Sequence, residues 1–287
     1  MSESNVPKRQ TRRLTVWRRL ALAACLACAL ALPFAADSAA AARDGGTRTL
    51  RVMSYNVHVG IGVDKRIDLA RVAEVINRER PDLVGLQEID CNVARTNRVD
   101  QIAELARLTG MQAAFAPNLE YQGGWYGVAV LSRLPLVATE HRLYQHLRET
   151  ERRGYLRAEV EVGRRRPIFV TTHLDYQHRD NRFHETEQLL ASVADLRAPV
   201  VIAGDFNDEP SGDSYRLMLT RFTDVWAGAG GQGEGLTYPA DKPAKRIDYI
   251  FYRARGSLRL RTRRAWVVES LASDHRAVMA EIDFGTD

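Results

Sequence analysis

One large α/β domain behind a short N-terminal targeting segment is the architecture that the sequence predicts. Short apolar runs of strand length, such as residues 200–203, recur between segments whose apolar residues follow the helical period. Polar side chains that could serve a reaction come directly after several of these runs. No linker, repeat or low-complexity tract follows residue 42, so the remaining roughly 245 residues suit a single domain.

Residues 1–42 have the composition of an export signal. Lysines and arginines precede the apolar run 20–36, and small residues follow it. This run is too short and too rich in alanine to favour a permanent membrane span. We therefore expect cleavage among residues 40–42 and an exported catalytic domain, periplasmic or secreted, at 43–287.

Two special export routes are minority interpretations. Arg12 and Arg13 fit a twin-arginine signal, and Cys25 ends a sequence that resembles a lipoprotein acylation box. We do not expect a lipid anchor at Cys25 or Cys28, because hardly any apolar run precedes the box. The choice between the general and the twin-arginine route stays open.

The charge and the cysteines of the mature chain differ from those of the whole sequence. Of 41 basic and 36 acidic residues, six and two lie in the signal, so 35 and 34 remain and the net charge is +1. Duplex DNA binding usually needs a much more basic surface. Cys91 is the one cysteine left, so the mature chain has no internal disulfide and must be stabilised by its core.

The domain is predicted to begin with a strand, a helix and a second strand. Residues 50–57 form a strand that ends in polar residues, with Asn56 among them, and Asp68 caps the helix that follows. The apolar run 83–86 is a buried strand that delivers Glu88 at its end. Most glutamates lie on surfaces, but an unpaired carboxylate after so apolar a run is costly, so Glu88 is at least as well explained as a cation ligand.

Two further candidates lie between residues 95 and 126. Arg95 precedes a helix predicted at 100–108, and it either binds an anionic substrate or simply belongs to a solvated helix start. Tyr126 precedes the buried strand 127–131, and it is either a hydrogen-bond donor to substrate or a core residue.

A strand hairpin and a helix occupy the middle of the domain. Residues 156–162 alternate between apolar and charged, as in a strand with one wet face. The basic run 164–166 is the turn into the strand 168–172, which ends at His173. A helix is predicted at 182–197.

The sharpest signal is the corner at residues 204–207, directly after the buried strand 200–203. This Gly-Asp-Phe-Asn sequence places Asp205 and Asn207 at a strand end. Taken alone, the corner could be an ordinary turn, because glycine, aspartate and asparagine are common turn residues. A short helix is predicted at 214–219.

The C-terminal part adds an acidic residue within a strand and a polar pair between strands. The strands are predicted at 246–251, 258–268 and 277–282. Asp248 lies between apolar neighbours on the first of them and so needs a partner. Asp274 and His275 precede the last strand, and His275 is our nominee for that partner.

The polar groups at the strand ends favour chemistry with a hard cation. They offer oxygen and imidazole but no cysteine, which suits Mg²⁺ or Mn²⁺ better than zinc. Carboxylates that hold a metal beside amides and histidines are typical of hydrolysis at phosphorus, with water as the nucleophile.

Seven motifs resemble the endonuclease/exonuclease/phosphatase, or DNase I-like, superfamily in family order. They are Ser-Tyr-Asn at 54–56, Gln-Glu at 87–88, Tyr-Gly-Val-Ala-Val-Leu-Ser-Arg at 126–133, Thr-His-Leu at 172–174, Gly-Asp-Phe-Asn at 204–207, Arg-Ile-Asp-Tyr at 246–249 and Ser-Asp-His at 273–275. The resemblance implies a four-layer sandwich in which two packed, mostly antiparallel sheets are flanked by helices, with the site at one edge.

The resemblance also implies roles for single residues. Metal ligands would be Glu88 and Asn56, with Asp274 close by. Asp205 would position or deprotonate the attacking water, and Asn207 would hold that water or a phosphoryl oxygen.

Two histidines complete the implied set. His275 would contact the phosphate and be oriented by Asp248, while His173 would stabilise the transition state or help the leaving group. Tyr126 lies one place from the position where some relatives keep a substrate tyrosine.

The sequence leaves the substrate open within one reaction class. We expect an exported Mg²⁺-dependent phosphodiesterase that prefers a lipid headgroup or a small diester over duplex DNA, acting as a monomer without a stable protein partner. A phosphomonoesterase of the inositide or sugar phosphate type and a secreted nuclease are the enzyme alternatives. A catalytically silent binding module on the same fold is the alternative from another class.

Overall fold

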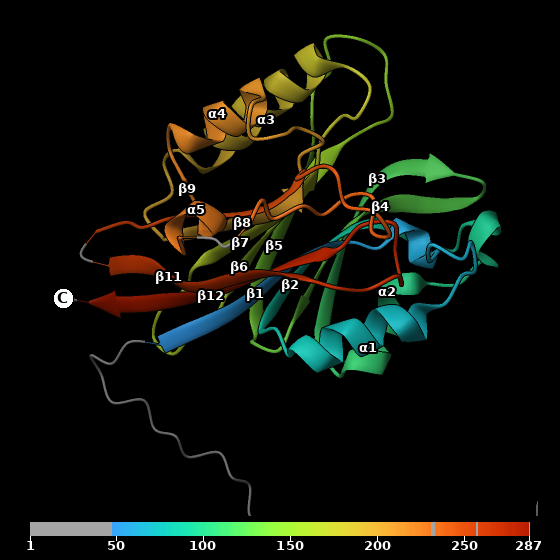
Figure 1. Cartoon of the computed structure of the whole chain (residues 1–287), viewed down its shortest axis with the longest axis horizontal. Coiled ribbons are helices and arrows are strands. Elements are labelled where there is room, and N and C mark those ends of the chain that lie inside the picture. The colour runs from blue at the N-terminus through green and yellow to red at the C-terminus, as the bar shows by residue number, and fades with distance from the viewer. Residues whose placement is uncertain (1–47, 231–232, 257, 287) are drawn as a thin grey trace, which may run out of the picture. The chain divides into compact units, whose positions relative to one another are not determined.

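The computed structural model describes residues 48–230, 233–256 and 258–286, and the strands within them form two six-stranded sheets (Figure 1). The predicted signal 1–42 and its cleavage point lie outside the described residues. In spatial order, sheet one consists of β11 (Leu258–Val268), β12 (Ala277–Thr286), β1 (Arg48–Asn56), β2 (Leu83–Cys91), β4 (Gly124–Ser132) and β3 (Gln112–Tyr121). Sheet two consists of β5 (Leu136–Leu143), β6 (Gly154–Val160), β7 (Ile168–His173), β8 (Val200–Asp205), β10 (Asp248–Arg253) and β9 (Thr223–Asp224).

Each sheet contains one parallel pair at its centre and is otherwise antiparallel. In sheet one the parallel pair is β1 and β2, and in sheet two it is β7 and β8. The carboxyl ends of a parallel pair lie at the same edge of a sheet. Both central pairs therefore carry polar residues to one edge of the molecule.

Helices cover the outer face of each sheet and make the remaining two layers (Figure 1). The outer face of sheet one packs against α1 (Leu69–Glu79) and α2 (Gln101–Thr109). That of sheet two packs against α3 (Arg179–Val193) and α4 (Asp213–Leu219). The short elements are α5 (Val225–Gly228), η1 (His58–Gly60) and η2 (Ala94–Thr96). The predicted four-layer sandwich is confirmed.

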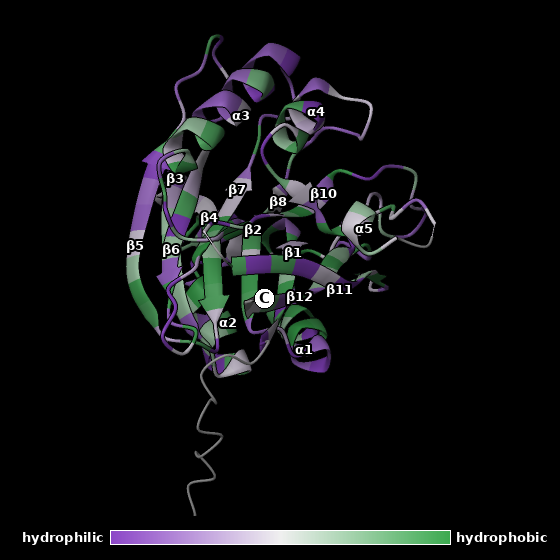
Figure 2. Ribbon diagram, turned by 90° about the vertical axis from the view of Figure 1, so that its left-hand side faces the viewer, coloured by the Kyte–Doolittle hydropathy of each residue, from purple (hydrophilic) through white to green (hydrophobic). Residues whose placement is uncertain are grey.

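A third apolar cluster fills the space between the sheets. It includes Val52 and Leu83 of sheet one, and Phe169 and Val201 of sheet two. Figure 2 shows the hydrophobic colouring gathered on central strands such as β2 and β4, and the hydrophilic colouring on the C-terminal half of β5 and on parts of α1 and α3. With no disulfide expected, burial of this apolar surface is the main favourable term in folding.

The sheets approach each other closely below the predicted site. A Cβ atom added at Gly85 of β2 would lie 2.9 Å from Oγ1 of Thr171 on β7 and 3.0 Å from Cβ of Ala203 on β8. Only glycine fits here without a shift of the neighbouring strands. The close approach lets the Gln87 side chain donate a hydrogen bond from Nε2 to Thr171 Oγ1 across 2.9 Å.

The helix boundaries follow from capping residues that the sequence identifies. Asp68 accepts hydrogen bonds from the backbone nitrogens of Ala70 and Arg71, and Asp100 accepts one from Ala103. Gly110 ends α2 in the left-handed conformation, with φ of 66°.

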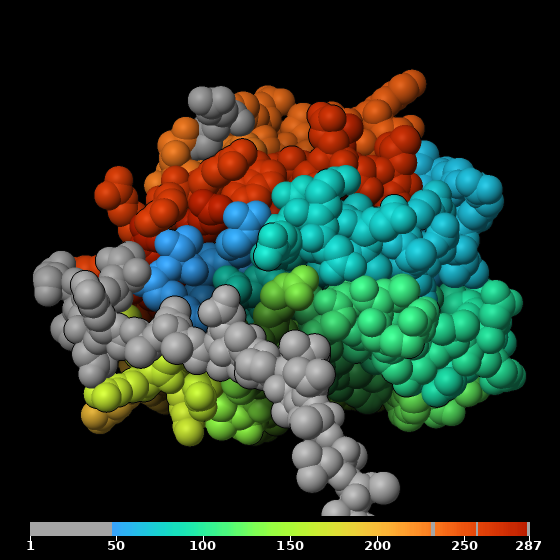
Figure 3. Space-filling view, turned by 90° about the horizontal axis from the view of Figure 1, so that it is seen from below, coloured from blue at the N-terminus to red at the C-terminus, as the bar shows by residue number. Residues whose placement is uncertain are grey.

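Seen from the side of α1 and α2, the cyan α1 region lies beside the red C-terminal strands (Figure 3). Trp266 of β11 donates its indole N–H to Glu79 across 3.2 Å.

The structure corrects three details of the predicted elements. The strand predicted at 83–86 continues to Cys91 through a β-bulge between Leu86 and Ile89. Helix α3 begins and ends earlier than the predicted 182–197. The edge strands β3 and β5 were not predicted, because β3 contains a proline and few β-branched residues and β5 is largely exposed.

Among the described residues, no helix is both long and apolar enough to cross a membrane.

Candidate active site

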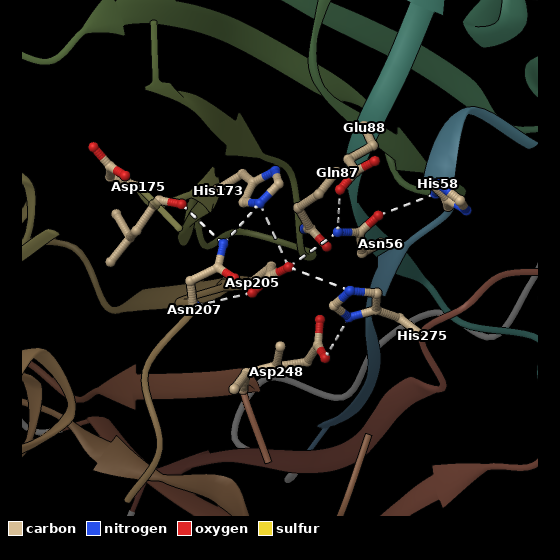
Figure 4. A network of polar contacts seen from close by, with 12 residues as sticks. Asn56, His58, Gln87, Glu88, His173, Asp175, Asp205, Asn207, Asp248 and His275 are labelled. Carbon is tan, nitrogen blue, oxygen red and sulfur yellow. Dashed lines mark hydrogen bonds and ion pairs between the residues drawn. The ribbon is translucent and has the colours of Figure 1, made fainter. Parts of the chain in front are cut away.

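The predicted polar residues meet where strand ends of both sheets converge (Figure 4). Register explains the convergence in sheet two: His173 is paired with Asp205, and Asp205 with Asp248. In sheet one, Asn56 at the end of β1 is paired with Gln87 of β2. His173, Asp205 and Asp248 therefore form a row across sheet two, and this row faces the ends of β1 and β2.

Asp205 lies at the centre of this network and is 1% exposed. Its carboxylate accepts hydrogen bonds from Asn56 Nδ2 at 3.0 Å and from the Asn207 backbone nitrogen at 2.9 Å. Burial raises the pKa of Asp205 and the nearby Asp248 carboxylate raises it further, to about 7. A carboxylate with this pKa can accept a proton from water near neutral pH.

Asp248 orients the ring of His275 on the side away from Asp205. The two side chains are joined by a 2.9 Å contact between His275 Nδ1 and Asp248 Oδ2, and both are buried. Burial alone would lower the pKa of His275, but Asp248 and then Asp205 outweigh it and raise this pKa to about 10. The ring is therefore a cation at neutral pH, and its Nε2 lies 3.7 Å from Asp205 Oδ2.

His173 lies on the other side of Asp205 and differs from His275 in charge. Its Nε2 is 3.5 Å from Asp205 Oδ2 and 3.0 Å from the side-chain nitrogen of Asn207. Its Nδ1 is 2.9 Å from Nη1 of Arg153. Burial, followed by the charges of Arg153 and His275, lowers the pKa of His173 well below its usual range. This ring is therefore neutral.

The predicted cation ligands come from strands β1 and β2 of sheet one and from the connection before β12. Glu88 lies on the bulge of β2 with φ of 59°, and its Oε1 accepts a hydrogen bond from Asn56 Nδ2 at 2.9 Å. Asn56 Oδ1 accepts from the His58 backbone nitrogen at 3.0 Å. Asp274 Oδ1 lies 3.4 Å from His58 Nδ1. The amide of Asn56 thus joins Glu88 to Asp205.

These residues fit a hard divalent cation by the chemistry of their donors. Glu88 and Asp274 supply carboxylate oxygens beside the same cavity. A second buried group is formed by Asp205, Asp248 and His275, whose ligand atoms lie within 4.8 Å of one another, but His275 would have to lose a proton before it could bind a cation. Within the described parts of the chain, Asp248 Oδ1 has no hydrogen-bond partner, so this group also retains an open oxygen.

A cavity of about 890 Å³ opens in front of the row. Eight of the ten residues predicted for the site line it: Glu88, Arg95, Tyr126, His173, Asp205, Asn207, Asp274 and His275. The other two, Asn56 and Asp248, lie behind this wall, where each contacts a residue that lines it. The structure therefore brings the whole predicted set together.

Arg95 and Tyr126 form a side wall of the cavity. Asp90 takes two hydrogen bonds from Arg95, at 2.8 and 2.9 Å, so part of the guanidinium is already engaged. The guanidinium carbon lies 5.3 Å from the ring centre of Tyr126. Tyr126 is 7% exposed and its hydroxyl is 3.5 Å from Arg153 Nη1. Both residues can therefore shape a substrate pocket.

Several residues of the cavity were missed by the sequence analysis. They are His58, Glu151, Arg153, Asp208 and Tyr238. Arg153 carried a usable signal: it directly precedes β6, and the predicted hairpin brings the start of β6 beside the end of β7, with Gly154 paired with His173. Polar residues that come before an antiparallel strand reach the same edge of the sheet as those that follow its partner, so a signal confined to residues after strands does not include them.

Comparison with known proteins finds relatives along most of the chain. The Escherichia coli (strain K12) protein YbhP, described as uncharacterized, is 27% identical over 252 residues, which cover 82% of this chain and 96% of YbhP. A Caenorhabditis elegans protein described as a putative neutral sphingomyelinase is 27% identical over 210 residues, covering 62% of this chain and 46% of that protein.

A solved structure has the same fold. A functionally unknown conserved protein from Enterococcus faecalis superimposes with a TM-score of 0.70 at 20% identity, covering 81% of this chain and 99% of that one. The model of the Endonuclease/Exonuclease/phosphatase family matches residues 53–275, which include all ten residues predicted for the site. The chain therefore belongs to the endonuclease/exonuclease/phosphatase family, whose members are phosphoester-cleaving hydrolases.

Proposed function

We propose that this protein is a divalent-metal-dependent phosphodiesterase that acts outside the cytoplasm. The observation that carries the proposal is the buried Asp205 carboxylate between a cationic and a neutral histidine, with the carboxylates of Glu88 and Asp274 on the same cavity. The export signal expected at residues 1–42 supports the location. We also propose that the enzyme acts as a monomer.

Each residue of the candidate site has a task in hydrolysis by water. Asp205 accepts a proton from the attacking water, and Asn207 holds that water or a phosphoryl oxygen. The cationic His275 contacts a phosphoryl oxygen, while Asp248 fixes its ring. His173 faces the phosphoryl group or the leaving oxygen from the other side of Asp205. A divalent cation, held by Glu88, Asp274 and Asn56, would neutralise charge on the phosphoryl oxygens.

The charge of the chain supports a small or lipid diester over duplex DNA. Non-specific affinity for DNA comes mostly from phosphate neutralisation by lysine and arginine. With 35 basic and 34 acidic residues after position 42, the mature chain has little net positive charge. The resemblance of part of the chain to a putative neutral sphingomyelinase supports a lipid phosphodiester.

Removal of divalent cations is expected to abolish turnover. Excess EDTA should stop hydrolysis, and Mg²⁺ or Mn²⁺ should restore it, because the proposed ligands Glu88, Asp274 and Asn56 offer carboxylate and amide oxygens, which suit these cations. The wild-type protein should also show a rise in melting temperature on addition of Mg²⁺, and Glu88→Gln should reduce that rise. Full activity in the chelator would contradict the metal requirement.

Replacement of Asp205 should affect chemistry more than binding. We expect Asp205→Asn to lower kcat roughly a hundredfold or more, the usual scale for loss of a general base. Asp68→Asn makes the same change at the N-cap of α1, outside the cavity, and should leave kcat unaltered. Wild-type turnover in a folded Asp205→Asn protein would remove Asp205 from the mechanism.

Asp248 and His275 should behave as one unit. Asp248→Asn and His275→Ala are each expected to lower kcat/KM to a similar extent, since Asp248 fixes the ring that contacts the phosphate. The double variant should lose little more than either single variant, because neither residue works without the other. Steady-state kinetics of the four proteins would measure the coupling, and fully additive losses would show that they act separately.

A substrate panel tests the proposal directly. Purified protein lacking residues 1–42 should hydrolyse bis-p-nitrophenyl phosphate or a phospholipid diester faster than plasmid DNA at about 150 mM salt, where electrostatic DNA binding is weakened. Inositol and sugar monophosphates form the monoester arm. Faster plasmid nicking would make the protein a secreted nuclease, and preference for the monoesters would make it a phosphomonoesterase.

A further inference from the structure

His173 lies between two nitrogen groups that cannot both donate to it. Its Nδ1 is 2.9 Å from Arg153 Nη1, and its Nε2 is 3.0 Å from the Asn207 side-chain nitrogen. A neutral imidazole has one nitrogen that accepts a hydrogen bond and one that donates. One of the two neighbours therefore decides which nitrogen of His173 carries the proton.

Arg153 determines which nitrogen of His173 carries the proton, because a guanidinium has no hydrogen-bond acceptor. It is always charged and offers only N–H groups, so His173 Nδ1 must accept and the proton must reside on Nε2. The Asn207 amide can present either an N–H donor or an oxygen acceptor, although turning its oxygen towards Nε2 would replace the 3.0 Å hydrogen bond from its Nδ2 to the Leu174 backbone oxygen. The contact with Arg153 therefore determines that Nδ1 of His173 accepts a hydrogen bond and that Nε2 donates one.

The position of Arg153 is rigidly built into the fold. The residue is 3% exposed, and its Nη1 lies 2.9 Å from Glu151 Oε1. It precedes Gly154, which pairs with His173 and has no room for a side chain: a Cβ there would lie 2.4 Å from the backbone oxygen of Arg142. The guanidinium is therefore held against the ring by the start of β6.

We propose that Arg153 is a positioning residue that fixes His173 as the neutral tautomer with its proton on Nε2. This nitrogen faces the reacting centre, 3.5 Å from Asp205 Oδ2. His173 then donates a hydrogen bond to a phosphoryl or leaving-group oxygen. The opposite tautomer would direct a lone pair at that oxygen and repel it. The catalytic part of this inference rests on the proposed function, whereas the tautomer itself does not.

Nitrogen NMR of the free protein tests the tautomer without any substrate. In protein with ¹⁵N-labelled histidine, the His173 signals are identified by their loss in His173→Gln, among seven histidines in the chain. The wild-type ring should show a protonated Nε2 and an unprotonated Nδ1. In Arg153→Met, which keeps the bulk but has no donor, Asn207 can donate to Nε2, so Nδ1 should gain a substantial share of the proton. Arg153→Lys should restore the wild-type pattern at least partly.

Kinetics separate positioning from direct substrate binding. Arg153→Met should lower kcat by about tenfold to a hundredfold, up to the scale of losing one donor to a developing charge, with KM nearly unchanged. Arg153→Lys should recover part of the loss. Arg157→Gln is the matched control: Arg157 lies within β6, the strand that Arg153 precedes, contacts Glu140 and Ser192, and does not line the cavity, so the NMR pattern and kcat should stay as in the wild type.

Two results would overturn the proposal. One is an unchanged His173 nitrogen pattern in Arg153→Met. The other is a raised KM with unchanged kcat, which would make Arg153 a substrate anchor. If the single variant fails to fold because the half-buried Glu151 loses its cationic partner, the double variant Glu151→Gln/Arg153→Met removes both charges and serves for the same measurements. A wild-type protein inert towards every phosphoester, but with the expected NMR pattern, would reject the proposed function and retain the tautomer.

Discussion

The buried carboxylate of Asp205 is the feature on which the arrangement of the site depends. A carboxylate with 1% exposure is tolerated only when hydrogen bonds and positive charge compensate for lost hydration. Asn56 and the Asn207 backbone supply the hydrogen bonds, and His275 supplies the charge. Because the compensation is incomplete, the pKa of Asp205 is raised to about 7. The same burial that is unfavourable for stability thus makes this residue suitable as a base.

The sheets hold these groups together through backbone register. Parallel pairing of β7 with β8 places His173 beside Asp205, and antiparallel pairing of β8 with β10 adds Asp248 to the row. The other sheet contributes Asn56, and the close approach at Gly85 keeps the two layers in reach of each other. Hydrogen bonds between the layers, such as the one from Gln87 to Thr171, follow from this spacing. Side-chain chemistry here is a consequence of strand geometry.

The sequence alone predicted one α/β domain and the candidate site, because polar residues after buried runs are a local signal, whereas the four-layer sandwich was predicted from the resemblance to a known family. Glu88 was found by this signal, although its strand continues past it through a bulge that depends on pairing with β4. The edge strand β3 carries no such signal, since it has no β-branched residue and Pro117 interrupts it. Arg153 lies before its strand, so only the predicted hairpin could have revealed it. The bulge at Glu88, the strand β3 and the role of Arg153 were not predicted because they depend on pairing between strands.

The two histidines differ in charge because different groups lie behind them. Burial lowers the pKa of both rings; Asp248 outweighs it at His275, whereas Arg153 adds to it at His173. On the proposed function, the cationic ring suits the phosphoryl oxygens, where negative charge is permanent. The neutral ring suits an oxygen that needs a hydrogen bond but not a full proton. Two positive rings on either side of Asp205 would instead lower the pKa of that carboxylate and weaken it as a base. A neutral His173 therefore preserves the basicity of Asp205.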